Sequence, residues 1–398
     1  MQVFPLHTDG AEAFGIMERC GVSPTGLSIM RDRFVQRTFV VKGLSSAGAN
    51  ALKQHLLSLD GEAAVPAHAV DCGEKRCDLL FSLRGDKFPA LVERLRLQCF
   101  HLPELADAIE TYLAAKGPWY DFRHDRIPVD RPAIMAILNV TPDSFSDGGR
   151  YATADAAVAR ADELLAQGAD ILDIGGESTR PGAAPVAAEE ETRRTAPVIA
   201  RVRKAHPKAV LSIDTAKSSV AASALEAGAD IVNDISAGSF DPGMAPLVAR
   251  AGVPFVLMHM QGTPRTMQQD PRYDDVLAEI NVFFDAAVKR ALDAGVKRER
   301  LILDPGFGFG KTAAHNFTIL RHLEAFSIHR LPLLAGLSRK SFVGTATGRK
   351  EPGDRLAGTL AAQTLAIEKG AAILRVHDAA AARDALLVHR AVREAPCC

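Results

Sequence analysis

Charged and polar residues recur directly after short apolar runs in the C-terminal two thirds of the chain. Asp214, Asn233 and Asp304 follow three such runs, and Lys340 and Arg375 lie just beyond or inside two others. Helix caps and turns explain Asp and Asn at such places, but a buried Lys or Arg needs a partner or a ligand. Asp and Asn match a heterocycle with adjacent donors and acceptors, whereas Arg, Lys and His suit phosphate. The set therefore predicts a pocket for a polar ring that carries an anionic group.

The elements that must position these residues alternate regularly between residues 131 and 392. Ala-rich amphipathic stretches such as Thr153–Gln167 and Asp274–Asp293 predict helices, and several such stretches end in Gly, which adopts a left-handed backbone at little cost. The short apolar runs that follow lack alternation, which favours strands buried on both faces of a parallel sheet. Eight strands are expected, near Ile134–Leu138, Ile171–Ile174, Leu211–Ile213, Ile231–Val232, Phe255–Met258, Leu301–Leu303, Leu333–Leu334 and Ile373–Val376.

Repeated β and α units of this number predict an α/β fold, a (β/α)8 TIM barrel over residues 131–395. That fold takes roughly 250 residues and carries its chemistry in the loops that follow the strands. A doubly wound open sheet has the same alternation, so the periodicity alone leaves this alternative open.

Residues 1–115 have a different pattern, which predicts a small α+β domain of ferredoxin-like type. One strand is expected at Arg37–Gly43, and Ala64–Val70 with Cys77–Leu83 is expected to form a hairpin. The expected helices are Ser46–Leu59, Phe88–Leu97 and Pro103–Ala114. Residues 116–130 are rich in Gly, Pro and charge and are expected to be a linker.

Composition limits the partners and the compartment that we expect. The 398 residues carry a formal net charge of −1, so no basic surface points to nucleic acid. No apolar run reaches the ~18 residues of a membrane span, and the N-terminus has no signal-peptide pattern. A cytoplasmic protein without membrane partners is expected. Cys72 and Cys77 with nearby His68 suggest a metal site, but a second ligand pair is missing, which favours reduced structural thiols.

Seven short strings resemble the dihydropteroate synthase family, and NVTPDSF and DPGFGFGK are highly specific for it. They occur in the order Asn139–Gly149 (NVTPDSFSDGG), Asp173–Gly182 (DIGGESTRPG), Ser212–Thr215 (SIDT), Val232–Ile235 (VNDI), Asp304–Lys311 (DPGFGFGK), Ser338–Ser341 (SRKS) and Arg375–Asp378 (RVHD). The resemblance covers residues 131–392 and says nothing about residues 1–130. It implies a homodimer that joins a hydroxymethyl-dihydropterin diphosphate to p-aminobenzoate with loss of diphosphate.

The resemblance also implies roles for individual residues. Asp214, Asn233, Asp304 and Lys340 would hold the pterin, Arg375 with His377 would bind the diphosphate, and Asn139 would ligate Mg²⁺ on that diphosphate. The residues expected to take part in catalysis are Asn139, Asp214, Asp304, Lys340 and Arg375. Loss of diphosphate leaves the pterin methylene electron-deficient, so the site must stabilise both a leaving anion and a developing cation.

A second group of residues would surround the other substrate and complete the pocket. Thr179, Arg180, Pro181 and Ser341 would frame p-aminobenzoate, and Met258 and Phe309 would pack the pocket walls. We interpret Gly306, Gly308 and Gly310 as places where backbone approaches the ring closely. They are not a dinucleotide fingerprint, because they follow the sixth strand of eight and not the first.

Two rival functions use the same fold. A pterin-binding methyltransferase barrel would share the carboxylate pair but has no need for the STRPG and SRKS strings, which would face a second, anionic substrate. A binding protein built on an inactive barrel would be favoured by loss of Asn139, Lys340 or Arg375, and all three are present. The sequence therefore favours the synthase.

Overall fold

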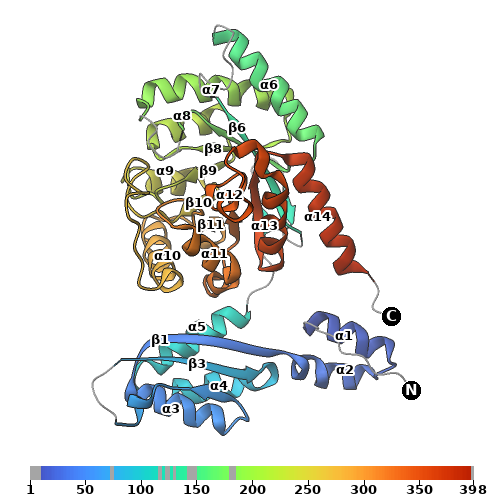
Figure 1. The fold of residues 1–398 in the computed structure, drawn as a ribbon, viewed down its shortest axis with the longest axis vertical. Coiled ribbons are helices and arrows are strands. Elements are labelled where there is room, and N and C mark those ends of the chain that lie inside the picture. Colours follow the sequence, from blue (N-terminus) through green and yellow to red (C-terminus); the bar gives the residue numbers. More distant parts are fainter. Residues whose placement is uncertain are drawn as a thin grey trace. The chain divides into compact units, whose positions relative to one another are not determined.

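The computed structural model describes residues 10–71, 76–114, 119–121, 126–128, 131–140, 150–178 and 185–395. The chain divides into two compact units, one up to Ala115 and one from Lys116 to Ala395 (Figure 1). Each unit has its own hydrophobic core.

The larger unit is a closed barrel of eight parallel strands, which confirms the predicted (β/α)8 barrel and excludes the open sheet. The strands follow one another around the barrel in chain order. They are β6 (Ala133–Asn139), β7 (Ile171–Gly175), β8 (Val210–Asp214), β9 (Ile231–Asp234), β10 (Phe255–Met258), β11 (Leu301–Asp304), β12 (Leu333–Ala335) and β13 (Ala371–Val376). Each of the eight predicted strands is present.

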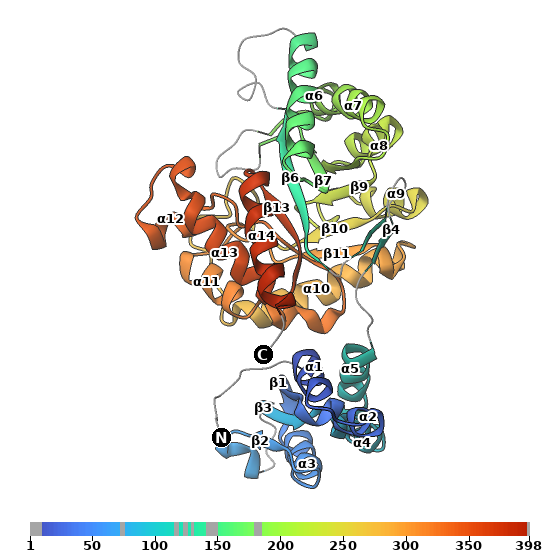
Figure 2. The same ribbon diagram turned by 90° about the vertical axis from the view of Figure 1, so that its right-hand side faces the viewer.

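Helices surround this barrel on its outer side (Figure 2). They are α6 (Arg150–Ala166), α7 (Ala188–Ala205), α8 (Ser218–Ala227), α9 (Met244–Ala251), α10 (Val276–Asp293), α11 (Ala313–Arg321), α12 (Ser341–Thr347), α13 (Leu356–Glu368) and α14 (Ala379–Glu394). The layer between strands and helices forms the main core, with Leu172, Ile213, Phe284 and Leu374 fully buried in it.

The inside of the barrel is filled by a second, smaller apolar cluster to which every strand contributes. Its members are Ala133, Met135, Ile171, Val210, Ile231, Val256, Ile302, Leu334 and Ile373. Successive side chains of a strand point to opposite faces, so residues two positions further along also point inward, nearer the C-terminal end. Asn233, Asp304 and Arg375 each lie two residues beyond a member of this cluster. The strand period therefore points these polar residues into the mouth of the barrel.

The N-terminal unit contains a three-stranded antiparallel sheet in the order β1-β3-β2. Its elements are α1 (Gly10–Arg19), α2 (Pro24–Met30), β1 (Gln36–Ser45), α3 (Ser46–Leu57), β2 (Glu62–Ala64), β3 (Arg76–Arg84), α4 (Phe88–Arg96) and α5 (Leu102–Ala114). This is the βαββα part of a ferredoxin-like fold, and within residues 10–114 as described no fourth strand follows. Leu52, Phe81 and Leu91 are fully buried in the core between sheet and helices.

One strand of this unit was predicted in the wrong place. The first strand of the expected hairpin, Ala64–Val70, ends at Ala64 in the structure, and a 3-10 helix spans Ala67–Asp71. Pro66 lies between the two segments and has no N–H to donate to a strand partner, so the pairing stops before it. Cys77–Leu83 does form a strand, within β3, and pairs with both β1 and β2.

Part of the range expected to be a linker forms a small antiparallel ribbon. β4 (Trp119–Asp121) pairs with β5 (Arg126–Pro128), and β4 contacts the 3-10 helix Arg298–Arg300 that precedes β11. The ribbon therefore belongs to the barrel unit, and a cut between the two units falls before Lys116.

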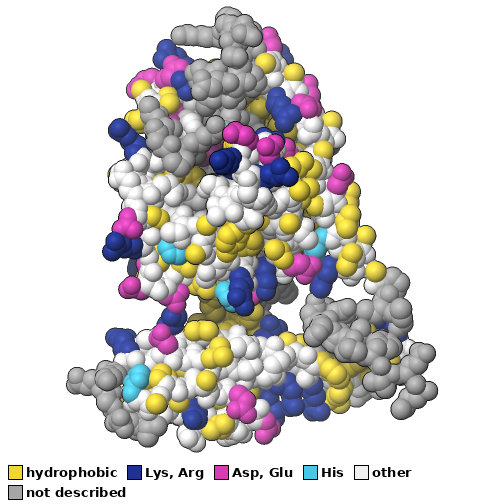
Figure 3. Space-filling view, viewed as in Figure 1, with side chains coloured by type: hydrophobic (Ala, Val, Ile, Leu, Met, Phe, Trp, Pro, Cys, Tyr) yellow, Lys and Arg dark blue, Asp and Glu magenta, His cyan; other side chains and the backbone are white. Residues whose placement is uncertain are grey.

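On the outside of the barrel, the neighbouring helices α13 and α14 carry exposed apolar side chains. Figure 3 shows hydrophobic side chains gathered over these helices. The exposed large apolar residues are Leu356, Leu365, Leu387, Val388 and Val392. In the parts of the chain that the structure describes, no helix combines the length and the apolar character that a membrane crossing requires.

We expect removal of residues 1–115 to leave a barrel that still unfolds cooperatively, because the two units have separate cores. A chain that begins after Asp121 lacks β4 as well, and its unfolding midpoint should be lower. For a domain of this size the midpoint falls by about 2–4 °C for each kcal/mol lost. Thermal unfolding followed by circular dichroism compares the two chains, and equal midpoints would show that the ribbon contributes nothing.

Candidate active site

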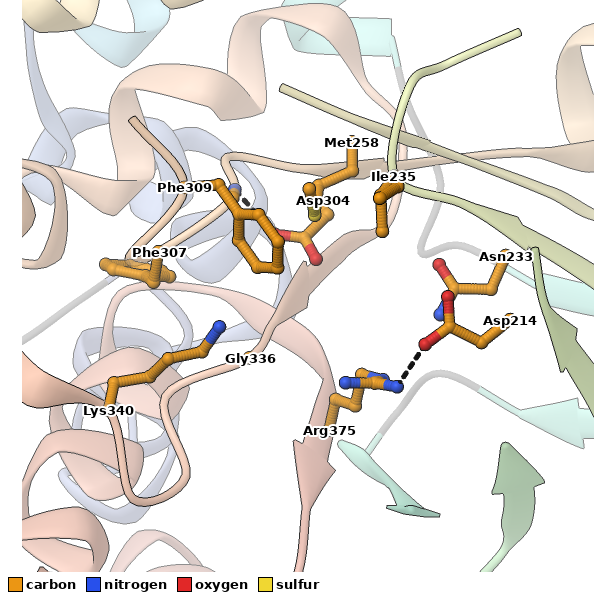
Figure 4. Close-up of a pocket in the computed structure, with 11 residues that line it drawn as sticks. Asp214, Asn233, Ile235, Met258, Asp304, Phe307, Phe309, Gly336, Lys340 and Arg375 are labelled. Atoms are coloured by element: carbon orange, nitrogen blue, oxygen red, sulfur yellow. Dashed lines mark hydrogen bonds and ion pairs between the residues drawn. The ribbon is translucent and has the colours of Figure 1, made fainter. Parts of the chain in front are cut away.

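A pocket opens at the C-terminal end of the barrel strands (Figure 4). Its lining contains seven of the residues predicted from the sequence, namely Asp214, Asn233, Met258, Asp304, Phe309, Lys340 and Arg375. Gly306, interpreted above as a close backbone approach, also lines it. Ile235, Phe307 and Gly336 line the pocket too and were not predicted. Polar groups from β8, β9, β11 and β13 thus share one space with aromatic rings from the loop after β11.

Arg375 is held inside the barrel by two carboxylates from neighbouring strands. Its Nε donates to Oδ2 of Asp173 at 2.7 Å, and its Nη2 donates to Oδ2 of Asp214 at 2.6 Å. Asn233 donates through Nδ2 to the same oxygen of Asp173 at 3.1 Å. Asp173 is fully buried on β7. The guanidinium plane is therefore fixed by two ion pairs, and one of its partners was not among the predicted site residues.

Asp214 and Asp173, the two acids that bind Arg375, differ in their surroundings. Burial raises the pKa of Asp214 to about 7, although the charge of Arg375 opposes this shift. Near neutral pH the Asp214 carboxyl can therefore take either protonation state, and it can accept or donate a hydrogen bond. The other oxygen of Asp173, Oδ1, is buried and has no hydrogen-bond partner among the described residues.

Asp304 and Lys340 lie on the opposite side of the pocket (Figure 4). Oδ1 of Asp304 accepts from the backbone N–H of Gly306 at 2.7 Å, which fixes the carboxylate. Burial raises the pKa of Asp304 to about 6. Burial and the charge of Arg375 lower the pKa of Lys340 to about 8. The Lys340 ammonium lies 4.2 Å from the ring centroid of Phe309, which places a cation on an aromatic face.

Three other predicted residues lie near the pocket but do not line it. Asn139 is exposed at the end of β6. Its side chain and that of Asp214 both face Gly175 on β7. A Cβ added to that glycine would lie 3.7 Å from Oδ1 of Asn139 and 3.7 Å from Oδ2 of Asp214. Ser341 is exposed as the first residue of α12. His377 follows β13. Thr179, Arg180 and Pro181 lie outside the described residues.

His377 is a neutral donor and not a cation. Burial and the charge of Arg375 lower its pKa to about 4. Its backbone N–H donates to Oγ of Ser338 at 3.2 Å, and its Nδ1 lies 3.0 Å from the same oxygen. The Ser338 hydroxyl can donate to Nδ1, which leaves the imidazole proton on Nε2. This arrangement keeps one N–H available for an anion next to Arg375.

A partly buried ion cluster around Lys217 fixes the ends of the segment that carries Thr179, Arg180 and Pro181. Lys217, in the loop after β8, donates to Oε2 of Glu191 at 2.5 Å and to Glu177. Glu177 also accepts from the backbone N–H of Val186 at 3.1 Å through Oε1. Glu191 is fully buried on α7. None of these residues was singled out from the sequence, where Glu177 is marked only by its place in the DIGGESTRPG string.

A model of the pterin binding enzyme family matches residues 135–377. The chain therefore belongs to the family of pterin-binding enzymes. Within this family it is similar to dihydropteroate synthases. The dihydropteroate synthase of Escherichia coli (strain K12) is 45% identical over 283 residues, which are 71% of this chain and 97% of that protein. The structure of Xanthomonas albilineans dihydropteroate synthase with 4-aminobenzoic acid has 48% identity and a TM-score of 0.67, and covers 71% of this chain and 100% of its own.

One further relative bears on the N-terminal unit. A probable bifunctional folylpolyglutamate synthase/dihydropteroate synthase of Haloferax volcanii is 40% identical over 385 residues, which are 94% of this chain and 45% of that protein. An alignment over so much of the chain has to include most of residues 1–115. The N-terminal unit is therefore shared with this relative, whereas the Escherichia coli enzyme matches a part of the chain about as long as the barrel unit.

We expect Arg375→Met to destabilise the protein, because it leaves Asp173 and Asp214 buried without their cation. Breaking a buried pair costs about 3–5 kcal/mol. The pKa of Asp214 is already raised to about 7, and without Arg375 it rises further, so the folded variant takes up a proton as the pH falls. The loss should therefore be larger near pH 8 than near pH 5.

Urea unfolding of Arg375→Met at the two pH values measures this difference. Arg390→Met is the matched control, because Arg390 pairs with Glu394 on the exposed side of α14, and such surface changes stay within about 0.5 kcal/mol. An equal loss at both pH values would contradict the charge argument.

Proposed function

We propose that this chain is a dihydropteroate synthase, which joins hydroxymethyl-dihydropterin diphosphate to p-aminobenzoate and releases diphosphate. The observation that carries this proposal is the pocket itself. Two carboxyl groups, an amide and an ammonium group surround a space walled by Met258, Phe307 and Phe309. A flat ring with polar edges and apolar faces fits such a space.

The pterin would be bound by its edge. The Asp304 carboxylate, fixed by Gly306, can accept hydrogen bonds from both the amino group and the ring N–H of the pterin. Lys340 can donate to the ring carbonyl, and Asn233 and Asp214 lie on the far side of the pocket for the remaining ring nitrogens. Charge-assisted hydrogen bonds of this kind, made in a buried site, are about twice as strong as neutral ones.

The diphosphate would lie beside Arg375 and His377 at the end of β13. Arg375 supplies a fixed positive charge, and neutral His377 supplies one N–H. As the bond between the methylene carbon and the diphosphate oxygen breaks, these donors stabilise the leaving anion. The amine nitrogen then forms its bond to the same carbon and loses a proton. The carboxyl groups of Asp214 and Asp304 stabilise positive charge that develops on the pterin.

Mg²⁺ would bind at the rim through Asn139. A single exposed amide oxygen at the end of β6 fits this ion, because Mg²⁺ commonly takes one or two protein ligands and fills its other positions with phosphate oxygens and water. The described residues contain no group of three or more His, Cys, Asp or Glu that could hold a metal by themselves. When bound, the ion would neutralise the diphosphate and make it a better leaving group.

p-Aminobenzoate would lie between the loops after β7 and β12. Thr179, Arg180 and Pro181 are proposed to frame it from one side and Ser341 from the other. Two features support this placement. Ser341 directly follows Lys340 and is exposed at the rim, and the Lys217 cluster anchors residues on both sides of the segment that carries Thr179–Pro181. Arg180 and the Ser341 hydroxyl can meet the carboxylate of this substrate.

We also propose that the enzyme is a homodimer and works in the cytoplasm. The exposed apolar residues of α13 and α14 form a surface that a second copy could cover. Contiguous exposed apolar surface of this kind is typical of protein interfaces. The thiols of Cys20, Cys77 and Cys99 are free, as they are in a reducing compartment.

An assay for diphosphate release tests the function. The wild-type protein with Mg²⁺ and the pterin diphosphate should release diphosphate when p-aminobenzoate is added and form dihydropteroate in equal amount. Asp304→Asn should lower kcat/KM on the order of 100-fold, because losing a buried charge-assisted partner costs about 2–5 kcal/mol. Asp293→Asn on the exposed side of α10 is the matched control. Release at the same rate without p-aminobenzoate, or no release at all, would overturn the proposal.

Pterin binding should depend on pH in two directions. Asp304 must be ionised to accept both hydrogen bonds, so affinity should fall as the pH drops through about 6. Lys340 must be protonated to donate at full strength, so affinity should also fall as the pH rises through about 8. Calorimetry with hydroxymethyl-dihydropterin measures both limbs.

Lys340→Met shows whether the alkaline loss of affinity comes from Lys340 or from ionisation of the pterin itself. The variant should bind more weakly, keep the acidic limb and lose the part of the alkaline limb that Lys340 causes. An alkaline limb that is unchanged in the variant would assign that limb to the ligand and contradict the role of Lys340.

A further inference from the structure

A buried lysine that takes no part in the proposed chemistry lies beneath the wall of the pocket. Lys311 lies near the end of the loop between β11 and α11, and only 3% of it is exposed. Its ammonium donates to Nδ1 of His259 at 2.9 Å, to the carbonyl of Phe309 at 2.9 Å and to the carbonyl of Gly306 at 3.0 Å. The carbonyl of His259 lies at 3.4 Å. No carboxylate accepts a hydrogen bond from this ammonium among the described residues.

The loop bends back around this ammonium. Gly306, Gly308 and Gly310 have positive φ angles of 66°, 79° and 63°, which a residue with a side chain rarely adopts. A Cβ on Gly306 would lie 1.9 Å from the carbonyl oxygen of His259, so only glycine allows the loop to lie this close to the loop after β10. Two carbonyls of the loop thereby point to the position that the Lys311 ammonium occupies.

The groups that Lys311 holds are the ones that shape the pterin side of the pocket. The Gly306 peptide carries the N–H that fixes Asp304, and Gly306 accepts from Lys311 through its own carbonyl. Phe309, whose carbonyl also accepts from Lys311, places its ring 4.2 Å from the ammonium of Lys340. Both bonded residues line the pocket. Residues that face the p-aminobenzoate side come from other loops.

The neighbours of Lys311 are consistent with a charged donor. Because the ammonium can only donate, Nδ1 of His259 accepts and the imidazole proton is on Nε2. Burial and the charge of Lys311 lower the pKa of His259 to about 2, so this ring stays a neutral acceptor. Tyr273 also holds this loop, since its hydroxyl donates to the carbonyl of Gly310 at 2.9 Å.

We propose that Lys311 is a positioning residue for the pterin substrate: its ammonium holds the loop after β11 in the shape that fixes the Asp304 carboxylate and the Phe309 ring. This inference rests on the proposed function for the identity of the ligand. Loss of the ammonium leaves buried carbonyls without a donor, and such groups rearrange to find one. The disturbance should therefore reach pterin binding and leave p-aminobenzoate binding nearly unchanged.

Lys311→Met tests this, because methionine fills a similar volume without donors. We expect KM for the pterin diphosphate to rise at least about tenfold, a change of ~1.4 kcal/mol, while KM for p-aminobenzoate changes less than about twofold. The Kd of bare hydroxymethyl-dihydropterin, measured by calorimetry, should rise with the first KM. Lys289→Met is the matched control, because Lys289 is exposed on α10 and pairs only with nearby Asp293 in the described structure.

A purely structural lysine would lower the unfolding midpoint without separating the two substrates. Equal increases of both KM values, or an unchanged Kd for bare pterin, would therefore overturn the proposal. If Lys311→Met does not fold, Tyr273→Phe decides by the same criteria, since it removes one milder support of the same loop. It should raise the pterin KM and Kd about threefold, and no change would overturn the proposal. If wild type binds bare pterin but forms no product, the proposed function fails while the calorimetric test of Lys311 still stands.

Discussion

Charge at the mouth of a closed barrel has to be balanced largely from within, since little water reaches it and an unpaired buried charge costs several kcal/mol. Arg375 achieves this for β7, β8 and β13 at once, because its guanidinium is wide enough to reach Asp173 and Asp214 together. Asn233 completes the set through Asp173. Arg375 and its partners thus link the ends of four strands, in addition to the backbone ladders that already join β7, β8 and β9. In the proposed function, the substrate would meet the faces of these groups that remain free.

The charges of some groups are not fully balanced by protein partners, and these groups line the pocket. Asp214 has its pKa raised to about 7 although it touches Arg375, because burial outweighs the nearby positive charge. Among the described residues Asp304 has no ion-pair partner, and a backbone N–H holds its carboxylate. Lys340 has no ion-pair partner in the described parts of the chain either, and its ammonium lies over the ring of Phe309. Each group lacks one strong partner, which a ring with alternating donors and acceptors could supply.

Local sequence patterns could predict the strands and the inward polar residues, because both follow from the two-residue period of a buried strand. Asn233, Asp304 and Arg375 are recognisable as polar residues where the pattern demands an apolar one. Pairing across the barrel has no such signal: Asp173 and Arg375 are 202 residues apart, and nothing near Asp173 marks it as a partner. The helices α1 and α2 were not predicted either, because they bury few side chains, such as Met17 and Leu27, and so leave a weak pattern.

Two lysines, partly exposed Lys217 and buried Lys311, anchor loops on the two sides of the pocket, and they differ in what surrounds them. Lys217 lies between two glutamates, whose hydrogen bonds outweigh burial and raise its pKa. Lys311 meets two loop carbonyls and an imidazole, and burial lowers its pKa to about 7. The charge of a lysine that lies between carboxylates is balanced locally, whereas a lysine held by dipoles, when it is protonated, acts on the other charges around it. Burial raises the pKa of Asp304, and the Gly306 N–H together with the charges of Lys340, Arg375 and Lys311 opposes this shift. Lys311 thus links the shape of the loop to the charge of the carboxylate that the loop positions.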